Sequence, residues 1–381
     1  MIIFTEIEQP TLTIAIPAYN EVKSIELLIR GFLATGYQNL VEIFVADGGS
    51  TDGTQEIVRQ LAAEDPRVRL LHNPAKFQSA GLNLILEKCT GELFLRADAH
   101  SDYASDYIEQ CVIAARQSRA LNVGGAQRFV AKNALQGGIA LSSMTFFGNG
   151  GAKYRNPNYD GYADTVYLGC FWRQDLLAIS GYSTQAIINE DAELNIRLRS
   201  YYQSHYLTNQ DIADKLISTD ECVYVSSKIN VCYYPRPNWQ ALVIQYFKYG
   251  SGRCITASKY DTRLQMRGML PFISISTVIV SGLASCVIPE LRYPLVLLLA
   301  LVFGLICIES LQVCWKYRNR FSTDIWRGDH NKNPSFIDLY LRCVLVTITL
   351  PFAHFCGYGY QLIVLLNADL NRNFDKTTNQ T

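Results

Sequence analysis

The stretch VADGGSTDGT, residues 45–54, joins the end of an apolar run to a turn with two acids, three glycines and three hydroxyl residues. The run before the turn, LVEIFVA (40–46), has the pattern of a buried strand, and residues 54–63 have the periodicity of a helix. The same order recurs on both sides: strands are predicted at 12–17, 68–71 and 92–97, and helices at 24–33 and 79–89. This alternation predicts an α/β fold with a mainly parallel sheet and helices on both faces.

Polar residues follow three of these predicted strands. Pro17–Glu21 follow the first strand, Asp47 the second and Asp98–His100 the fourth. Because ligands of open α/β sheets bind at the carboxyl ends of the strands, these residues are expected to share one rim. An acid and an imidazole at such a strand end can hold a divalent cation that bridges a diphosphate. The sequence therefore predicts a site for a nucleotide-diphosphate donor.

Other nucleotide chemistries lack their motifs. The Gly-x-Gly-x-x-Gly of dinucleotide oxidoreductases does not follow the first strand, and the Gly-Lys-Ser/Thr of P-loop nucleoside triphosphatases is missing. Lys and Arg total 34, as do Asp and Glu, so no basic excess suggests a nucleic-acid partner. Eleven cysteines without a Cys-x-x-Cys pair are typical of buried apolar residues in a reducing compartment, and not of disulfides or zinc sites.

Four motifs in order resemble a family-2 glycosyltransferase of the GT-A fold: TIAIPAYNE (13–21), VADGGSTDGT (45–54), RADAH (96–100) and NEDAELNIRLR (189–199). Three further stretches, DTVYLGCFWRQ (164–174), YYPRPNW (233–239) and QYFKYGSGR (245–253), together with the apolar tail, resemble bacterial exopolysaccharide transferases of the succinoglycan type. The resemblance implies a GT-A fold and an inverting hexosyltransferase.

The resemblance also implies roles for individual residues. Donor contacts are implied for Pro17, Tyr19, Glu21, Asp47 and Asp98, with Lys248 or Arg253 as a cation beside the phosphates. Asp98 and His100 match the metal motif, which implies a Mg²⁺ or Mn²⁺ cofactor. Asp191 matches the catalytic base with Glu190 beside it, and Gln245 and Tyr249 are expected on the acceptor side.

Several of these residues have alternative interpretations. The stretch from Asp47 to Asp52 could be only a turn that caps the next helix, with Asp52 as the better cap candidate. Glu190–Asp191 could instead complement a helix N-terminus. Asp102 could replace His100 as a metal ligand, and Tyr249 could anchor at a membrane surface. Residues 245–249 carry Lys and Tyr where a Gln-x-x-Arg-Trp box has Arg and Trp, which argues against a strict processive synthase.

The last third of the chain predicts three membrane segments, at 269–288, 293–313 and 343–366. The loop between the second and third segments is basic, whereas the link between the first two holds one acid and one arginine. Basic loops stay cytoplasmic. We therefore expect residues 1–260 to form a cytosolic catalytic domain and 261–381 a multi-pass region in the inner (plasma) membrane, with the C-terminus outside. Pro351, Gly357 and Gly359 could break the third segment into a re-entrant element.

These features together predict a membrane-anchored enzyme that moves a sugar from a nucleotide-diphosphate sugar to a lipid-linked saccharide, with a polyprenyl diphosphate as the expected lipid. Within enzymes, a polyprenyl-phosphate sugar transferase and a processive polysaccharide synthase are the alternatives. From another class, a non-catalytic membrane scaffold is the alternative, although Asp47, Asp98 and Asp191 all remain acids.

Overall fold

The computed structural model describes residues 9–184, 189–207, 221–260 and 266–378. The chain forms two compact units. The first comprises Met1–Arg128 and Lys153–Tyr233, and the second comprises Phe129–Ala152 and Tyr234–Thr381. These units are not the predicted cytosolic and membrane regions, whose boundary after residue 260 stays a prediction.

The elements of the first unit alternate as the sequence predicts. In chain order they are β1 (Leu12–Ala18), α1 (Ile25–Leu33), β2 (Leu40–Asp47), α2 (Thr54–Glu64), β3 (Val68–His72), α3 (Gln78–Lys88), β4 (Leu93–Arg96), β5 (Ser101–Tyr103), α4 (Tyr107–Ser118), β6 (Asn122–Gly125), β7 (Arg128–Phe129, at the unit boundary), η1 (Lys153–Arg155), β8 (Gly161–Tyr162), β9 (Tyr167–Trp172), α7 (Arg173–Ala178), α8 (Glu190–His205), β10 (Val223–Ser226) and β11 (Val231–Tyr233). The predicted strands and helices before residue 100 are confirmed.

The main sheet has the strand order β3-β2-β1-β4-β9-β6-β10-β8. Strands β3, β2, β1 and β4 run parallel, as do β6 and β10, whereas β9 runs antiparallel to both β4 and β6. The sheet is therefore mixed and mostly parallel. The register pairs Ala18 with Asp47 and Asp47 with His72, so the first three strands end at one edge.

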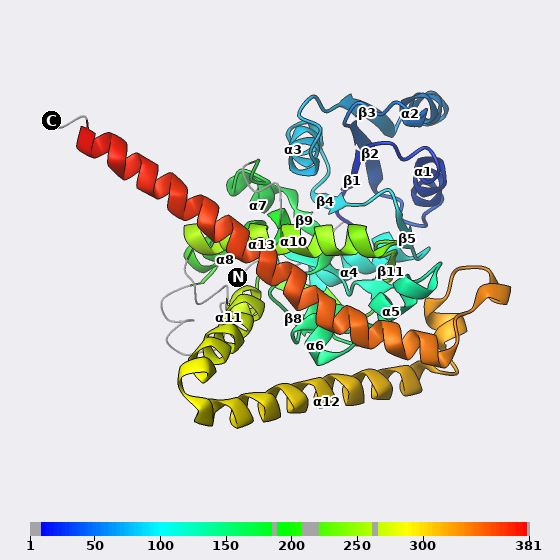
Figure 1. Cartoon of the computed structure of the whole chain (residues 1–381). Helices are drawn as coiled ribbons and strands as arrows, with labels where there is room; N and C mark the ends of the chain where they lie inside the picture. The colour runs from blue at the N-terminus through cyan, green and yellow to red at the C-terminus, as the bar shows by residue number, and fades with distance from the viewer. Residues whose placement is uncertain (1–8, 185–188, 208–220, 261–265, 379–381) are drawn as a thin grey trace. The chain divides into compact units, whose positions relative to one another are not determined.

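Alternate side chains of the central strands build two hydrophobic cores. Ile14 and Ile16 of β1 belong to the core that includes α1 and α2, whereas Ala15 belongs to the core that includes α3. Strand β2 divides in the same way, because successive side chains of a strand point to opposite faces. Figure 1 shows α1 and α2 on one side of β1 and β2, and α3 on the other. Both faces of the parallel strands are covered, as predicted.

The second unit is helical in the part that the structure describes. Its elements are α5 (Ala134–Ser142), α6 (Phe146–Asn149), α10 (Trp239–Lys259), α11 (Met266–Val287), η3 (Pro289–Leu291), α12 (Arg292–Tyr317), η4 (Phe321–Ile325), η5 (His330–Lys332) and α13 (Phe336–Thr378). Three stretches are long and apolar enough to cross a membrane: Gly268–Val287, Pro289–Tyr317 and Phe336–Ala368. They overlap the three predicted segments.

The third stretch is continuous, so the break considered at Pro351, Gly357 and Gly359 does not occur. Helix α13 runs through Pro351. A Cβ at Gly357 would collide with the carbonyl of Phe247 on α10, and a Cβ at Gly250 on α10 would collide with the carbonyl of His354. Small residues let helices of membrane proteins approach closely. Here the glycines serve the contact between α10 and α13 instead of ending a helix.

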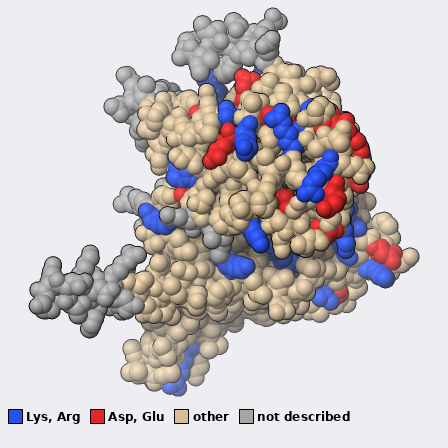
Figure 2. All heavy atoms as spheres, turned by 90° about the horizontal axis from the view of Figure 1, so that it is seen from above, with Lys and Arg blue, Asp and Glu red and all other residues tan. Residues whose placement is uncertain are grey.

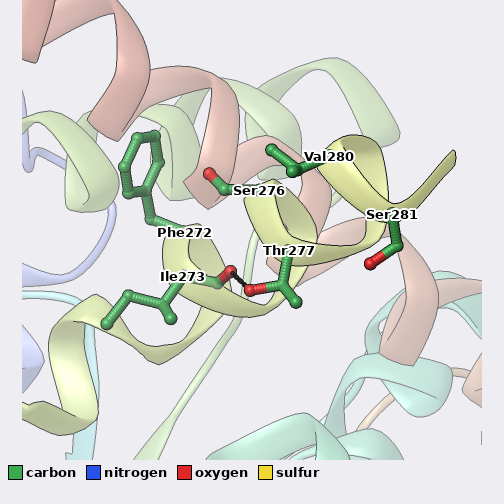
Figure 3. Close-up of a pocket in the computed structure, with 6 residues that line it drawn as sticks. All are labelled: Phe272, Ile273, Ser276, Thr277, Val280 and Ser281. Atoms are coloured by element: carbon green, nitrogen blue, oxygen red, sulfur yellow. Dashed lines mark hydrogen bonds between the residues drawn. The ribbon is translucent and has the colours of Figure 1, made fainter. Parts of the chain in front are cut away.

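Large apolar side chains are exposed along α11 and α12. The groove in Figure 3 lies on α11 alone and is lined by Phe272, Ile273, Ser276, Thr277, Val280 and Ser281. Thr277 donates its hydroxyl hydrogen to the Ile273 carbonyl at 2.9 Å, which is a common way to satisfy a hydroxyl in an apolar helix.

Where charged side chains gather in Figure 2, acidic and basic residues are interleaved, which agrees with the balanced composition.

Candidate active site

The turns after β1 and β2 are bonded to each other. The Asn20 amide donates to Ser50 Oγ at 2.8 Å, and the Thr51 amide donates to Asn20 Oδ1 at 2.9 Å. Buried Asp47 ends β2 and accepts from the amides of Gly49 and Ser50, each at 2.9 Å. The Asp47 carboxylate therefore organises the turn. Its predicted contact with a nucleotide stays a prediction.

Asp52 lies in the same turn and bonds to the start of α2, but the N-cap of that helix is Gly53 and not Asp52 as expected. Its Oδ1 accepts from the Thr54 amide at 3.1 Å, and Thr54 is the first residue of α2. Its Oδ2 accepts from the Val22 amide at 3.1 Å. Asp52 thus holds the start of α2 against the turn after β1.

Arg96, the last residue of β4, is a buried cation surrounded by acids. It donates a hydrogen bond to Asp191 Oδ1. Its Nε lies 3.5 Å from Asp98 Oδ1, and its Nη2 lies 3.8 Å from Glu190 Oε1. Asp98 follows β4, and Glu190 and Asp191 begin α8. One guanidinium therefore brings together three residues that the sequence predicts in the site.

Three carboxylates around one guanidinium leave an excess of negative charge. Burial, and then repulsion from Asp191, raise the pKa of Glu190 to about 7, although Arg96 opposes the shift. The Asp191 side chain is 47% exposed and carries the direct bond to Arg96. Glu190 titrates near neutral pH, and solvent can reach Asp191 beside it. Such a pair of carboxyl groups is suited to proton transfer.

His100 and Glu21 join the loop after β4 to the loop after β1. His100 Nδ1 lies 3.1 Å from Glu21 Oε1. Burial acts to raise the pKa of Glu21, but hydrogen bonds from His100 and Ser24 lower this pKa below its ordinary value. Metal-binding histidines commonly place their second ring nitrogen against a carboxylate in this way, which orients the ring.

Asp98 is oriented by neighbours that the sequence interpretation did not include. Gln78 Nε2 at the start of α3 donates to Asp98 Oδ1 at 3.0 Å. The Tyr103 hydroxyl accepts from the Asp98 amide at 2.7 Å and donates to the Asp98 carbonyl at 3.1 Å. The loop between β4 and β5 is therefore held at both of its ends.

The side chains of Asp98 and His100 suit a divalent cation that the protein and the phosphates of a substrate bind together. No group of three or more His, Cys, Asp or Glu side chains forms a metal site within the described residues. However, Mg²⁺ is usually held by one or two carboxylates together with substrate phosphates. Carboxylate and imidazole donors also suit Mn²⁺. Asp98 and the oriented His100 match that donor set.

The remaining predicted residues come from the turn after β1 and from α10. Tyr19, on the turn after β1, is exposed. Gln245, Lys248, Tyr249 and Arg253 all lie on α10 of the second unit, where Gln245 Nε2 donates to the Tyr249 hydroxyl at 3.1 Å. Their contacts with donor and acceptor stay predictions.

Comparison with known proteins identifies the chain. The sequence model of the family "Glycosyl transferase family 2" matches residues 13–172. The succinoglycan biosynthesis protein ExoA of Rhizobium meliloti (strain 1021) is 34% identical over 269 residues, which cover 70% of this chain and 76% of ExoA. The chain belongs to glycosyl transferase family 2. The predicted family is thereby confirmed, and the chain is a glycosyltransferase.

Two more distant proteins resemble this family-2 glycosyltransferase. A Methanococcus voltae enzyme named dolichyl N-acetyl-alpha-D-glucosaminyl phosphate 3-beta-D-2,3-diacetamido-2,3-dideoxy-beta-D-glucuronosyltransferase is 21% identical over 65% of this chain and 74% of its own. The structure of the mannosyltransferase PcManGT from Pyrobaculum calidifontis, in complex with GDP-Man and Mn²⁺, aligns with a TM-score of 0.51 and 16% identity. The alignment covers 92% of this chain and 87% of the PcManGT chain. The latter likeness supports the GT-A fold alone.

Arg96, like Gln78 and Tyr103, is a site residue that the sequence did not predict. A signal was present, because residues two apart on a strand share a face, and Arg96 lies two positions before Asp98. Its burial was not visible, since an arginine at the end of a strand is more often exposed.

Proposed function

We propose that this family-2 glycosyltransferase is an inverting hexosyltransferase anchored in the inner (plasma) membrane with its catalytic unit in the cytosol. The donor is a nucleotide-diphosphate sugar, and the acceptor is a saccharide on a lipid, with a polyprenyl diphosphate as the lipid. The product enters exopolysaccharide or cell-surface glycan. The observation that carries the proposal is the cluster of Arg96 with Asp98, Glu190 and Asp191, at the end of β4 and the start of α8.

The cluster supplies the groups that an inverting transfer needs. The acceptor hydroxyl oxygen bonds to the anomeric carbon, the bond from that carbon to the diphosphate oxygen breaks, and the hydroxyl proton must pass to a base. Asp191 is the exposed member of the cluster and takes this proton. Burial raises the pKa of Asp191, and the direct bond to Arg96 opposes this shift, which favours the ionised carboxylate that can take the proton.

Charge on the departing diphosphate needs a counterion. Asp98 and His100 would hold Mg²⁺ or Mn²⁺, which supplies positive charge to the phosphates when bound. Glu21 orients the His100 ring, and Gln78 orients the Asp98 carboxylate. Lys248 or Arg253 adds a further cationic contact in this proposal. Asp47 contacts the nucleoside from the turn that it organises, together with Pro17 near the end of β1 and Tyr19 on the turn after β1.

The relatives support the substrate classes. PcManGT is described in complex with GDP-Man and Mn²⁺, which supports a nucleotide-sugar donor and a divalent cation. The name of the Methanococcus voltae enzyme places its acceptor sugar on a dolichyl phosphate, which supports a lipid-linked acceptor. ExoA is named for succinoglycan biosynthesis, which supports a role in exopolysaccharide assembly. Gln245 and Tyr249 are the acceptor-side residues in this proposal.

The membrane orientation rests on charge. The basic residues between α12 and α13 are Arg318, Arg320, Arg327 and Lys332, and Lys316 lies in the last turn of α12. Basic loops are retained on the cytosolic side, which favours a cytosolic loop and an outer C-terminus.

A transfer assay on membranes that contain the full-length chain tests the proposal. Labelled nucleotide sugars are supplied one at a time with a lipid-linked saccharide extract, and the lipid and polymer fractions are separated. We expect one sugar to be added to the lipid-linked saccharide. Addition directly to polyprenyl phosphate, or a ladder of polymer lengths, would favour the corresponding alternative enzyme. Asp191→Asn is the matched negative control, and equal labelling with this variant would contradict catalysis by the chain.

A further inference from the structure

Residues 134–152 contain no Asp, Glu, Lys or Arg, although the sequence analysis places them inside the cytosolic domain. They form α5 and α6 and belong to the same compact unit as the apolar helices. All residues of α5 from Leu135 to Ser142 are buried. A helix that is buried on all sides needs a partner on each face.

Helix α13 is one of these partners. A Cβ at Gly137 would lie 2.8 Å from Leu339 Cδ2, and a Cβ at Gly138 would lie 2.6 Å from Arg342 Cβ, so the glycine pair allows α5 to lie directly on α13. The hydroxyls of Ser142 and Thr347 are 2.8 Å apart and form a hydrogen bond. These are contacts with a helix that is apolar and long enough to cross a membrane.

Helix α12 holds the other end of the segment through an acid. Glu309 lies within the apolar stretch Pro289–Tyr317, where an acid is costly unless it has partners. Its carboxylate accepts from the Phe146 amide and, at 3.3 Å, from the Phe147 amide. These amides open α6 and have no partner inside that helix, as at every helix N-terminus. The Glu309 carboxylate therefore gains hydrogen-bond donors, and the amides of Phe146 and Phe147 gain an acceptor.

Two aromatic side chains at this junction face outward. Phe146 is 64% exposed and Phe147 is 38% exposed, with their rings edge to face at 5.9 Å. Because their amides bond to Glu309, the two residues lie beside α12, where Leu305 and Ile308 are also exposed. Glu309 precedes the end of α12 by eight residues, or about 12 Å of helix, which is a depth inside the hydrocarbon of a bilayer.

We infer that residues 134–152 form a membrane-embedded element that does not cross the bilayer, that Phe146 and Phe147 contact the acyl chains of phospholipids, and that Glu309 fixes the element to α12. The inference rests on the membrane insertion of α12 in the proposed function. It extends the membrane region beyond residues 261–381 into the part of the chain that the sequence assigns to the cytosol.

Photocrosslinking in the full-length protein tests the inference. p-Benzoylphenylalanine replaces Phe146 in protein reconstituted in phosphatidylethanolamine and phosphatidylglycerol vesicles whose acyl chains are radiolabelled. The same group at Leu297 on α12, which is 71% exposed, reports whether α12 is inserted, and at Leu27 on α1, which is 79% exposed, it reports background. We expect lipid adducts at 146 and 297 and none at 27.

The outcomes separate the two claims. Adducts at 297 with none at 146 would overturn the inference and leave the proposed membrane anchor intact. No adducts at 297 would instead contradict the insertion of α12 and with it the proposed anchor.

The role of Glu309 has its own test. Glu309→Leu removes both acceptors, so the adduct yield at 146 should fall several-fold while the yield at 297 is unchanged. Glu309→Gln keeps one carbonyl acceptor and should retain most of the yield at 146. An unchanged yield at 146 in Glu309→Leu would show that Glu309 does not hold the element, and a fall at 297 would report misfolding instead.

Discussion

Arg96 donates a hydrogen bond to Asp191, although the two residues lie 95 positions apart in the sequence. The bond joins the end of β4 to the start of α8, and it brings a buried cation to the residue that we propose as the base. Arg96 also lies beside Asp98, which we propose as a metal ligand. The acid on the acceptor side and the acid on the diphosphate side of the proposed reaction therefore share one guanidinium.

Replacing Arg96 tests this arrangement directly. Arg96→Met removes the cation that faces all three carboxylates, and loss of one member of a buried ion pair costs about 3–5 kcal/mol of unfolding free energy. Arg96→Lys keeps the charge but loses the planar fork, so it should fold better and still lose most of the transfer rate. Chemical denaturation and initial rates measure the two effects.

Arg30 provides the matched control for Arg96. It pairs with Glu26 and Glu64 at an exposed site, and such surface pairs contribute little to stability. Arg30→Met should therefore leave both stability and rate nearly unchanged. Full transfer activity in Arg96→Lys would remove Arg96 from the catalytic arrangement.

Replacing Asp191 tests the proposed base. Asp191→Asn keeps the shape of the side chain but removes its ability to take a proton, so the rate should fall by about 10²–10⁴-fold. Binding of the nucleotide sugar, measured by titration calorimetry, should stay within a few-fold of the wild type. If the variant turned over at a near-normal rate, Asp191 would not be the base.

The raised pKa of Glu190 predicts a pH dependence of stability. The pKa is about 7 in the folded chain and near 4.5 in the unfolded chain, so the folded state binds more protons between these values. The contribution of Glu190 to the unfolding free energy should therefore decrease as pH rises from about 4.5 to 7. Glu190→Gln should remove this decrease. Denaturation curves of the wild type and of Glu190→Gln at several pH values would show the difference in unfolding free energy. Parallel pH profiles would show that Glu190 has an ordinary pKa.

The strand ends of the site could be predicted because their signal is local. Asp47 and Asp98 each follow an apolar run, and chain direction alone then places them at the carboxyl edge of the sheet. Arg96 depends instead on acids that come 95 residues later, so no local pattern marks it as buried. The same holds for residues 134–152, whose partner Glu309 lies 163 residues from Phe146. A short apolar run cannot show whether protein or lipid covers it.

The proposed cation site predicts a dependence on divalent metal. Chelation should abolish transfer, and Mn²⁺ or Mg²⁺ should restore it, because Asp98 and His100 need the ion to neutralise the phosphates. Glu21→Gln should raise the metal concentration needed for half-maximal rate by about 10–100-fold, since Glu21 orients the His100 ring. Rates that are unchanged in excess chelator would reject the cation, and an unchanged metal requirement in Glu21→Gln would reject the role of His100.

The proposed orientation predicts where each loop lies. Three crossings from a cytosolic catalytic unit leave the residue after Thr381 on the outer side of the membrane, so a reporter fused there should be active only outside the cytosol. A reporter inserted between Arg327 and Lys332, in the basic loop between α12 and α13, should report the cytosol. Neutralising Arg318 and Arg320 should weaken this preference, because the retained positive charges set the orientation. A cytosolic reporter after Thr381 would require an even number of crossings, two or four, and would remove α11, α12 or α13 from the bilayer or add a further crossing.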